Sequence, residues 1–220
     1  MKSVRLQGSD KYIEVRKIFC LGKNYAEHAK EMHSEVPTTP IVFLKPSTAI
    51  LTNGEDIIIP NISHEPHHEV ELIVAISREG KNINATHAYD YVLGYGIGLD
   101  MTLRDIQNEA KRKGNPWTVA KGFDTSAPVS DIIPKSNIPD PHKLTIQCTV
   151  NSVVRQQGST DNMIFSIPAV IEYISSLFTL EPGDVIFTGT PEGVGPVHNG
   201  DRIVAELVGH ISIAHTIRTA

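Results

Sequence analysis

Short runs of residues that favour β-strands recur along the chain and restrict the folds that it can adopt. Each run is rich in Val, Ile or Tyr and is bounded by Pro, Gly, Asn or Asp, the usual pattern of strands separated by turns. We expect strands at Ile41–Leu44, Asp56–Ile59, Val70–Ile76, Tyr91–Leu99, Leu144–Val150, Asp184–Thr188 and Arg202–Leu207.

Three segments have the spacing and the boundary residues of helices. We expect them at Asn24–Met32, Leu103–Lys113 and Ile167–Phe178, with Asn24, Thr102 and Ser166 as N-caps. Glu27, three residues after Asn24, would complete a capping box, and Gly114 would end the second helix. A few helices among many strands, without regular alternation of the two, predict a mostly β fold of the α+β class with a mixed sheet.

The composition excludes several classes of protein. The 220 residues suffice for one domain with a full core, and 40% hydrophobic with 20% charged residues is unlike a disordered or membrane protein. A formal net charge of -5, with scattered Lys and Arg, argues against nucleic acid as a partner. Cys20 and Cys148 form no C-x-x-C pair, and the N-terminus resembles no targeting segment. We therefore expect a cytoplasmic protein without a membrane partner.

The run His67-His-Glu-Val-Glu71 is the most informative stretch of the chain. Alternate side chains of a strand share one face, so Glu69 and Glu71 would point the same way, roughly 6.5–7 Å apart. Apolar residues follow at once, and burying two like charges costs on the order of several kcal/mol. A divalent cation (Mg²⁺, Mn²⁺ or Ca²⁺) would remove the repulsion, because such ions prefer carboxylate oxygens.

Asp100 is a third candidate ligand, at the end of one predicted strand and just before a predicted helix. Gly94, Gly96 and Gly98 alternate before it, so one face of that strand lacks side chains and lets another backbone or a ligand approach. The alternative is that the two glutamates line a solvated strand and Asp100 merely caps the helix. The zinc deaminase and dinucleotide-binding motifs do not match, since no P-C-x-x-C follows and the glycine spacing differs.

Other side chains could supply the remaining chemistry. His28 and Glu31 lie three residues apart on a predicted helix and would face the same way, as a general base and the carboxylate that orients it. Lys121 follows an apolar stretch and could stabilise an enolate oxygen. Arg104 and Gln107 share a helix face. The glycine-rich Thr188-Gly-Thr-Pro-Glu-Gly-Val-Gly195 could bind a carboxylate through its backbone N–H groups.

Together these segments resemble the fumarylacetoacetate hydrolase family, from about Lys17 to about Leu207, and most of all its short, single-domain acylpyruvase branch. The motifs are Gly22-Lys-Asn-Tyr-Ala-Glu-His28, Phe43-Leu-Lys-Pro-Ser47, His67-His-Glu-Val-Glu71, Gly98-Leu-Asp-Met-Thr-Leu-Arg-Asp105, Pro116-Trp-Thr-Val-Ala-Lys121 and the glycine-rich segment above, with Ile138-Pro-Asp-Pro-His-Lys143 and Met163-Ile-Phe-Ser-Ile-Pro168 typical of that branch.

The resemblance implies the family's mixed β-sandwich roll, with residues 1–16 as an N-terminal arm or strand and 17–220 as one catalytic domain, usually in a homodimer. It implies Mg²⁺, replaceable by Mn²⁺ or Ca²⁺, on Glu69, Glu71 and Asp100. His28 and Glu31 would form a catalytic dyad on a mobile lid. Contacts to a small 2-oxo acid substrate would come from Lys23, Arg104, Gln107, Lys121, Gly189 and Thr190.

The first functional hypothesis is a metal-dependent hydrolase that splits 2,4-dioxo acids (acylpyruvates) into pyruvate and a carboxylic acid. His28, held by Glu31, would take a proton from water, and Lys121 would stabilise the enolate. The alternative uses the same enolate as an oxaloacetate decarboxylase or a 2-oxo acid tautomerase. A binding protein that keeps a metal site is a third hypothesis, and the dyad argues against it because binding alone needs no base.

Overall fold

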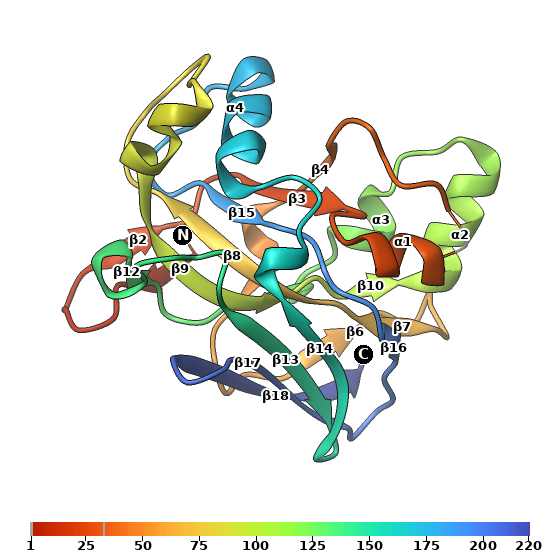
Figure 1. The fold of residues 1–220 in the computed structure, drawn as a ribbon. Coiled ribbons are helices and arrows are strands. Elements are labelled where there is room, and N and C mark those ends of the chain that lie inside the picture. Colours follow the sequence, from red (N-terminus) through yellow and green to blue (C-terminus); the bar gives the residue numbers. More distant parts are fainter. Residues whose placement is uncertain (1, 33) are drawn as a thin grey trace.

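The computed structural model describes residues 2–32 and 34–220, and it consists mainly of strands with a few short helices (Figure 1). The α-helices are α1 (Ala26–Glu31), α2 (Arg104–Lys113), α3 (Thr118–Lys121) and α4 (Ile167–Leu177), and 3₁₀ turns lie at Ser47–Ala49, Ala85–Tyr91, Lys135–Asn137 and Thr160–Asn162. The strands are β1 (Ser3–Arg5), β2 (Tyr12–Glu14), β3 (Ile18–Gly22), β4 (Ile41–Lys45), β5 (Ile50–Leu51), β6 (Ile57–Ile59), β7 (Pro66–His68), β8 (Val70–Ile76), β9 (Val92–Leu99), β10 (Thr102–Leu103), β11 (Ala127–Pro128), β12 (Ile133–Pro134), β13 (Thr145–Val150), β14 (Val153–Ser159), β15 (Val185–Phe187), β16 (Gly195–Pro196), β17 (Arg202–Leu207) and β18 (Ile211–Thr219).

Two sheets carry the fold. The larger has the order β12-β9-β8-β15-β3-β4, and the other has the order β14-β13-β17-β18-β6. Each is mixed, because β15 runs parallel to β3 and β18 runs parallel to β6 while the remaining neighbours are antiparallel. This arrangement confirms the mostly β fold with mixed sheets that the sequence predicts.

The larger sheet is buried on both faces. Leu72 and Ile97 on one face belong to the same buried cluster as Ile146 and Ile203 of the smaller sheet. On the other face, Ile73 belongs to a second buried cluster, which includes chain segments outside the two sheets. Every residue of β8 is consequently buried, which explains its almost unbroken apolar sequence.

The glycines of β9 allow the chain to pass directly over the sheet. A Cβ on Gly94 would lie 2.0 Å from the Ile133 carbonyl oxygen, and one on Gly96 would lie 2.6 Å from Ser130 Oγ. Ile133 belongs to β12, which pairs with β9 at this point. The prediction that another backbone approaches this face is therefore confirmed.

The predicted strands are all present, each with boundaries within one residue of the expected ones, and the three predicted helices correspond to α1, α2 and α4. Ser166 caps α4 as predicted, accepting from the Ala169 N–H at 3.4 Å. Gly114 ends α2 in the left-handed conformation, with φ 70°. Local sequence thus predicts a helix boundary correctly where the capping residue acts on its own helix and not on a distant part of the chain.

The predicted N-cap Asn24 is wrong. Tyr25 occupies the N-cap position of α1. The buried Asn24 side chain instead donates to the carbonyl oxygens of Thr188 at 2.8 Å and Phe165 at 3.1 Å. A buried amide must satisfy its hydrogen bonds, and these partners are far away in sequence, so the local pattern could not reveal them.

The predicted N-cap Thr102 is wrong for the same reason. Leu103 occupies the N-cap position of α2. Thr102 belongs to β10, and its buried hydroxyl accepts a hydrogen bond from Lys121 Nζ at 2.6 Å. The side chain thus supports the neighbouring site instead of the helix terminus.

The first residues form a hairpin of β1 and β2 on the side of the domain. Val4 is buried in the second cluster, and the Arg5 carbonyl accepts from the Ile132 N–H at 2.8 Å. Met1 of the predicted arm lies outside the described residues. The division at residue 17 stays a prediction. None of the described helices has the length and hydropathy needed to cross a membrane.

The contact between β9 and β12 gives a stability prediction. Gly94→Ala places its methyl group against the Ile133 backbone, so we expect the free energy of unfolding to fall by about 1–3 kcal/mol. Gly195→Ala is the control, because its nearest neighbour would be His68 Nε2 at 3.7 Å. Urea unfolding of both variants measures the difference, and equal stability of Gly94→Ala and the wild type would contradict the close approach.

Candidate active site

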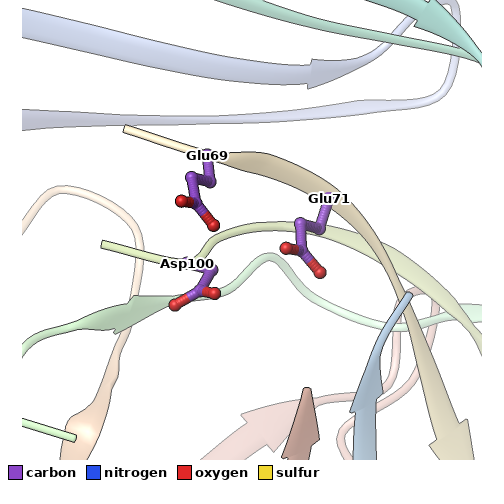
Figure 2. Close-up of side chains that lie close together, drawn as sticks. All are labelled: Glu69, Glu71 and Asp100. Carbon is purple, nitrogen blue, oxygen red and sulfur yellow. The ribbon is translucent and has the colours of Figure 1, made fainter. Parts of the chain in front are cut away.

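Three carboxylates meet at one end of the ladder between β8 and β9 (Figure 2). Glu71 lies opposite Gly98 in the register, and the Asp100 N–H donates to the Glu69 carbonyl at 2.8 Å. Side chains alternate along each strand, so Glu69, Glu71 and Asp100 project from the same face. One oxygen of each lies within 4.8 Å of the others, and all three residues are buried. The sheet register therefore assembles the cluster that the sequence predicts.

Lys121 lies between two of these carboxylates. Its Nζ donates to Glu69 Oε2 at 2.8 Å and to Asp100 Oδ2 at 2.6 Å, and it lies 5.1 Å from the centre of the Phe43 ring. The residue ends α3 and is buried. The side chain that the sequence placed in an apolar stretch is thus held by two opposite charges.

Two further cations reach the cluster. Arg104 donates from Nη2 to Glu69 Oε1 and from Nη1 to Gln107 Oε1, the latter at 2.6 Å. Lys45 Nζ lies 2.8 Å from Asp100 Oδ1 and donates to the carbonyl oxygens of Lys121 and Ser126. Both cations are almost fully buried. Each therefore depends on the carboxylates as much as it stabilises them.

The charges divide the carboxylates into different electrostatic environments. Burial would raise the pKa of Glu69, but the positive charges of Lys121 and Arg104 outweigh it and hold that pKa well below its usual value. Burial, together with the negative charges of Asp100 and Glu69, raises the pKa of Glu71 well above its usual value. Burial would lower the pKa of Lys121, yet Asp100 and Glu69 raise it. Glu71 is thus the carboxylate whose charge is least compensated.

The donor set fits a hard divalent cation. Within the described residues Glu71 forms no ion pair, and the partner of its Oε2 is the Gly189 N–H at 2.7 Å. Asp100 Oδ1 is buried without a hydrogen bond of good geometry, despite its contact with Lys45. Three oxygen ligands of this kind suit Mg²⁺, Mn²⁺ or Ca²⁺. A cation here would relieve the repulsion that burial of the cluster creates.

His28 and Glu31 form the expected pair on α1. His28 Nδ1 lies 3.1 Å from Glu31 Oε2, and Glu31 Oε1 accepts from the Gly193 N–H at 2.9 Å. Gly193 has φ 92°, and a Cβ there would lie 2.2 Å from the Arg155 carbonyl oxygen. The glycine-rich loop thus fixes Glu31, and Glu31 fixes the imidazole. If Nδ1 carries the proton, Nε2 is free to accept one.

A small cavity of about 30 Å³ joins the carboxylates to His28, and it has room for about one water molecule. Its wall contains the residues Leu21, Gly22, Lys23, His28, Met32, Phe43, Glu69, Glu71, Asp100, Arg104, Gln107, Lys111, Trp117, Lys121 and Thr190. Lysine and arginine side chains outnumber the carboxylates on this wall. The interior therefore suits a small anion even before a metal adds its charge.

The predicted substrate residues are brought together to different degrees. Lys23, Arg104, Gln107, Lys121 and Thr190 all line the cavity. Gly189 is adjacent, but its N–H is used by Glu71. The Thr190 hydroxyl donates to the Val70 carbonyl at 2.8 Å. Substrate contacts at these positions stay predictions, and Gly189 has a role in holding Glu71.

Several residues of the site were not found from the sequence. Lys45 lies in the predicted Phe43-Leu-Lys-Pro-Ser47 motif, which indicated its importance without its contact to Asp100. The buried Gln156 accepts from the Val70 N–H at 3.0 Å, and its Nε2 donates to Thr190 Oγ1 at 2.8 Å. No local pattern marks Gln156. Lys111 could have been found, because it lies seven residues after Arg104 and shares its helix face.

The match to a protein family covers most of the chain. Residues 17–218 match the family described as Fumarylacetoacetate (FAA) hydrolase C-terminal. Human oxaloacetate tautomerase FAHD1, mitochondrial, is 49% identical over 202 residues, which cover 92% of this chain and 91% of that protein.

Solved structures are similar over nearly the whole molecule. The fumarylpyruvate hydrolase of Pseudomonas aeruginosa in complex with Mn²⁺ and pyruvate is 36% identical, with a TM-score of 0.95 over 100% of this chain and 96% of that one. The 2-hydroxyhepta-2,4-diene-1,7-dioate isomerase of Mycobacterium marinum is 38% identical, with a TM-score of 0.83 over 94% and 76%. The chain therefore belongs to the fumarylacetoacetate hydrolase family, whose relatives here include hydrolases and isomerases.

Proposed function

We propose that this protein is a metal-dependent tautomerase that interconverts the keto and enol forms of oxaloacetate. The observation that carries the proposal is the small cavity whose wall brings His28 and three carboxylates together with four cationic side chains. The excess of cations on its wall suits a substrate with two carboxylates. The FAHD1 relatives, named oxaloacetate tautomerases, support the same choice.

Glu69, Glu71 and Asp100 would hold Mg²⁺, or Mn²⁺ or Ca²⁺ in its place. When bound, the cation would supply Lewis-acid polarisation of the 2-oxo group. The lack of charge compensation at Glu71 supports this assignment, since the described cations contact Glu69 and Asp100 instead. The Mn²⁺ and pyruvate in the Pseudomonas aeruginosa relative support it independently.

The protein side chains would then move one proton. His28, oriented by Glu31, would take a proton from C3 of the substrate at Nε2. Lys121 would stabilise the negative charge that develops on the 2-oxo oxygen, and the proton held by His28 would then pass to that oxygen, which regenerates the imidazole. Arg104 and Gln107, linked to each other and to Glu69, would hold the substrate carboxylate. The reaction breaks a C–H bond and forms an O–H bond without other change.

The second candidate is the hydrolysis of acylpyruvates. The His28–Glu31 pair favours it, because the same imidazole can take a proton from water. The hydroxide would attack C4, the C3–C4 bond would break, and a carboxylic acid and the enolate of pyruvate would form. Protonation at C3 completes pyruvate. Decarboxylation of oxaloacetate would reach the same enolate by loss of CO₂.

The binding partners, the cellular compartment and the oligomeric state of the enzyme are proposals as well. The substrate class needs no nucleic acid or membrane partner. The described cysteines, Cys20 and Cys148, are both free and buried, which is compatible with the reducing cytoplasm that we expect. The family resemblance predicts a homodimer, and sedimentation at several protein concentrations would measure the assembly.

Assays on two substrates separate the candidate reactions. With Mg²⁺ present, we expect faster keto–enol conversion of oxaloacetate than hydrolysis of acetylpyruvate, because acetylpyruvate lacks the second carboxylate. Absorbance of the enol and release of pyruvate measure the two reactions. Faster hydrolysis of acetylpyruvate would make the hydrolase the main activity, and inactivity toward both would reject both candidates.

The charge of Glu71 predicts opposite effects on stability and metal binding. Glu71→Gln removes an uncompensated buried charge, so we expect the protein treated with chelator to gain about 1 kcal/mol or more in free energy of unfolding. The wild type should gain about 2.7 kcal/mol from Mn²⁺ at 100 times its Kd, and the variant should not. Glu206→Gln on β17 is the control. Stabilisation of Glu71→Gln by Mn²⁺ equal to that of the wild type would remove Glu71 from the ligand set.

The dyad predicts a graded loss of activity. His28→Ala should lower kcat about 10²- to 10⁴-fold, because it removes the general base. Glu31→Gln should lower kcat less, since the imidazole stays but loses its charged partner. His210→Ala, at an exposed turn, serves as the control. An unchanged kcat for His28→Ala would mean that another group transfers the proton.

A further inference from the structure

Lys111 lines the cavity but has no part in the reaction as proposed so far. It follows Arg104 and Gln107 on α2 at a spacing that places all three on one helix face, and all three belong to the cavity wall. With a rise of about 1.5 Å per residue, Lys111 lies about 6 Å beyond Gln107 along the helix axis. The helix thus presents a second cation at a distance from the carboxylate cluster.

The ammonium group of Lys111 lacks a carboxylate partner within the described part of the chain. Its Nζ lies 5.3 Å from the centre of the Trp117 ring. Lys23, on the same wall, also forms no described ion pair, and it has the uncommon φ of 58° for a residue other than glycine. Although the residue as a whole is exposed, partial burial of its ammonium group, then the charges of Arg104 and Lys23, lower the pKa of Lys111 to about 8. Two neighbouring cations repel each other, so an anion between them would be stabilised.

We propose that Lys111, with Lys23, binds the second carboxylate of the substrate and makes the enzyme selective for dicarboxylic 2-oxo acids. This inference rests on the proposed function and adds the residue that recognises the far end of the substrate. Arg104 and Gln107 would hold the carboxylate beside the 2-oxo group, and Lys111 would hold the other. Lys111 and Lys23 share the cavity wall, and neither forms an ion pair within the described residues. Lys113 on the same helix, by contrast, pairs with Glu109 at 2.6 Å.

Binding of two dicarboxylates tests the assignment without relying on turnover. Malate has the same carbon chain as oxaloacetate, with a carboxylate at each end, whereas oxalate has no distal group. Calorimetry with Mg²⁺ should show that Lys111→Met weakens malate binding about 10-fold or more, as loss of a charged hydrogen bond predicts. Oxalate binding should change less than about 2-fold, within the range of an indirect effect.

Matched variants complete the experiment. Lys113→Met removes the same charge two residues away and should bind malate like the wild type, and Lys111→Arg should retain malate binding. Thermal unfolding confirms that the variants fold, as expected for an exposed position. For turnover, Lys111→Met should raise KM for oxaloacetate with little change for acetylpyruvate.

Equal losses for malate and oxalate, or no loss for malate, would overturn the role of Lys111. Failure of the wild type to bind malate would do the same. If the wild type binds malate but does not convert oxaloacetate, the proposed reaction fails, and the binding comparison still decides whether Lys111 recognises the second carboxylate.

Discussion

The ammonium group of Lys121 between Glu69 and Asp100 is the contact on which the site depends. None of these charges could be buried alone without a large loss of solvation energy. Together they join the end of α3 to the ends of β8 and β9. Because the cations satisfy two of the carboxylates, the third, Glu71, is left with a backbone N–H and strong repulsion. The structural ion pairs therefore create the electrostatic demand that a metal ion would meet.

The scaffold makes this cluster possible by burying the larger sheet on both faces. The carboxylates extend the face on which Ile73 packs into the second core, which accounts for their burial. The proposed substrate contacts come mainly from α2, α3 and the glycine-rich loop, whereas the proposed metal ligands lie in or next to β8 and β9. Gln156 links these layers, since its amide bonds both the Val70 N–H of β8 and Thr190 of the glycine-rich loop. Rigid strands and a tethered loop keep the reacting groups in register.

Local sequence predicted the elements well wherever the pattern was repetitive. The run Val70–Ile76 and the other apolar strands were found because β-favouring runs and the breakers that bound them are properties of neighbouring residues. β14 was missed, since most of its side chains are exposed and only pairing with β13 defines it. β18 was also missed, although its buried residues alternate. The two wrong caps, Asn24 and Thr102, are polar groups that bond to distant partners instead of their own helices.

The sequence by itself determined the fold class, the shared face of Glu69 and Glu71, and the pairing of His28 with Glu31. These follow from the two-residue period of a strand and the spacing of a helix, which act over a few residues. The sequence named Asp100 as a candidate third ligand, and only the tertiary structure decided its position, because strand register places it beside Glu69. The same holds for Lys45, whose contact with Asp100 depends on which elements pack around it. Long-range packing brings such charges together, and no local pattern encodes contacts between residues that are far apart in the sequence.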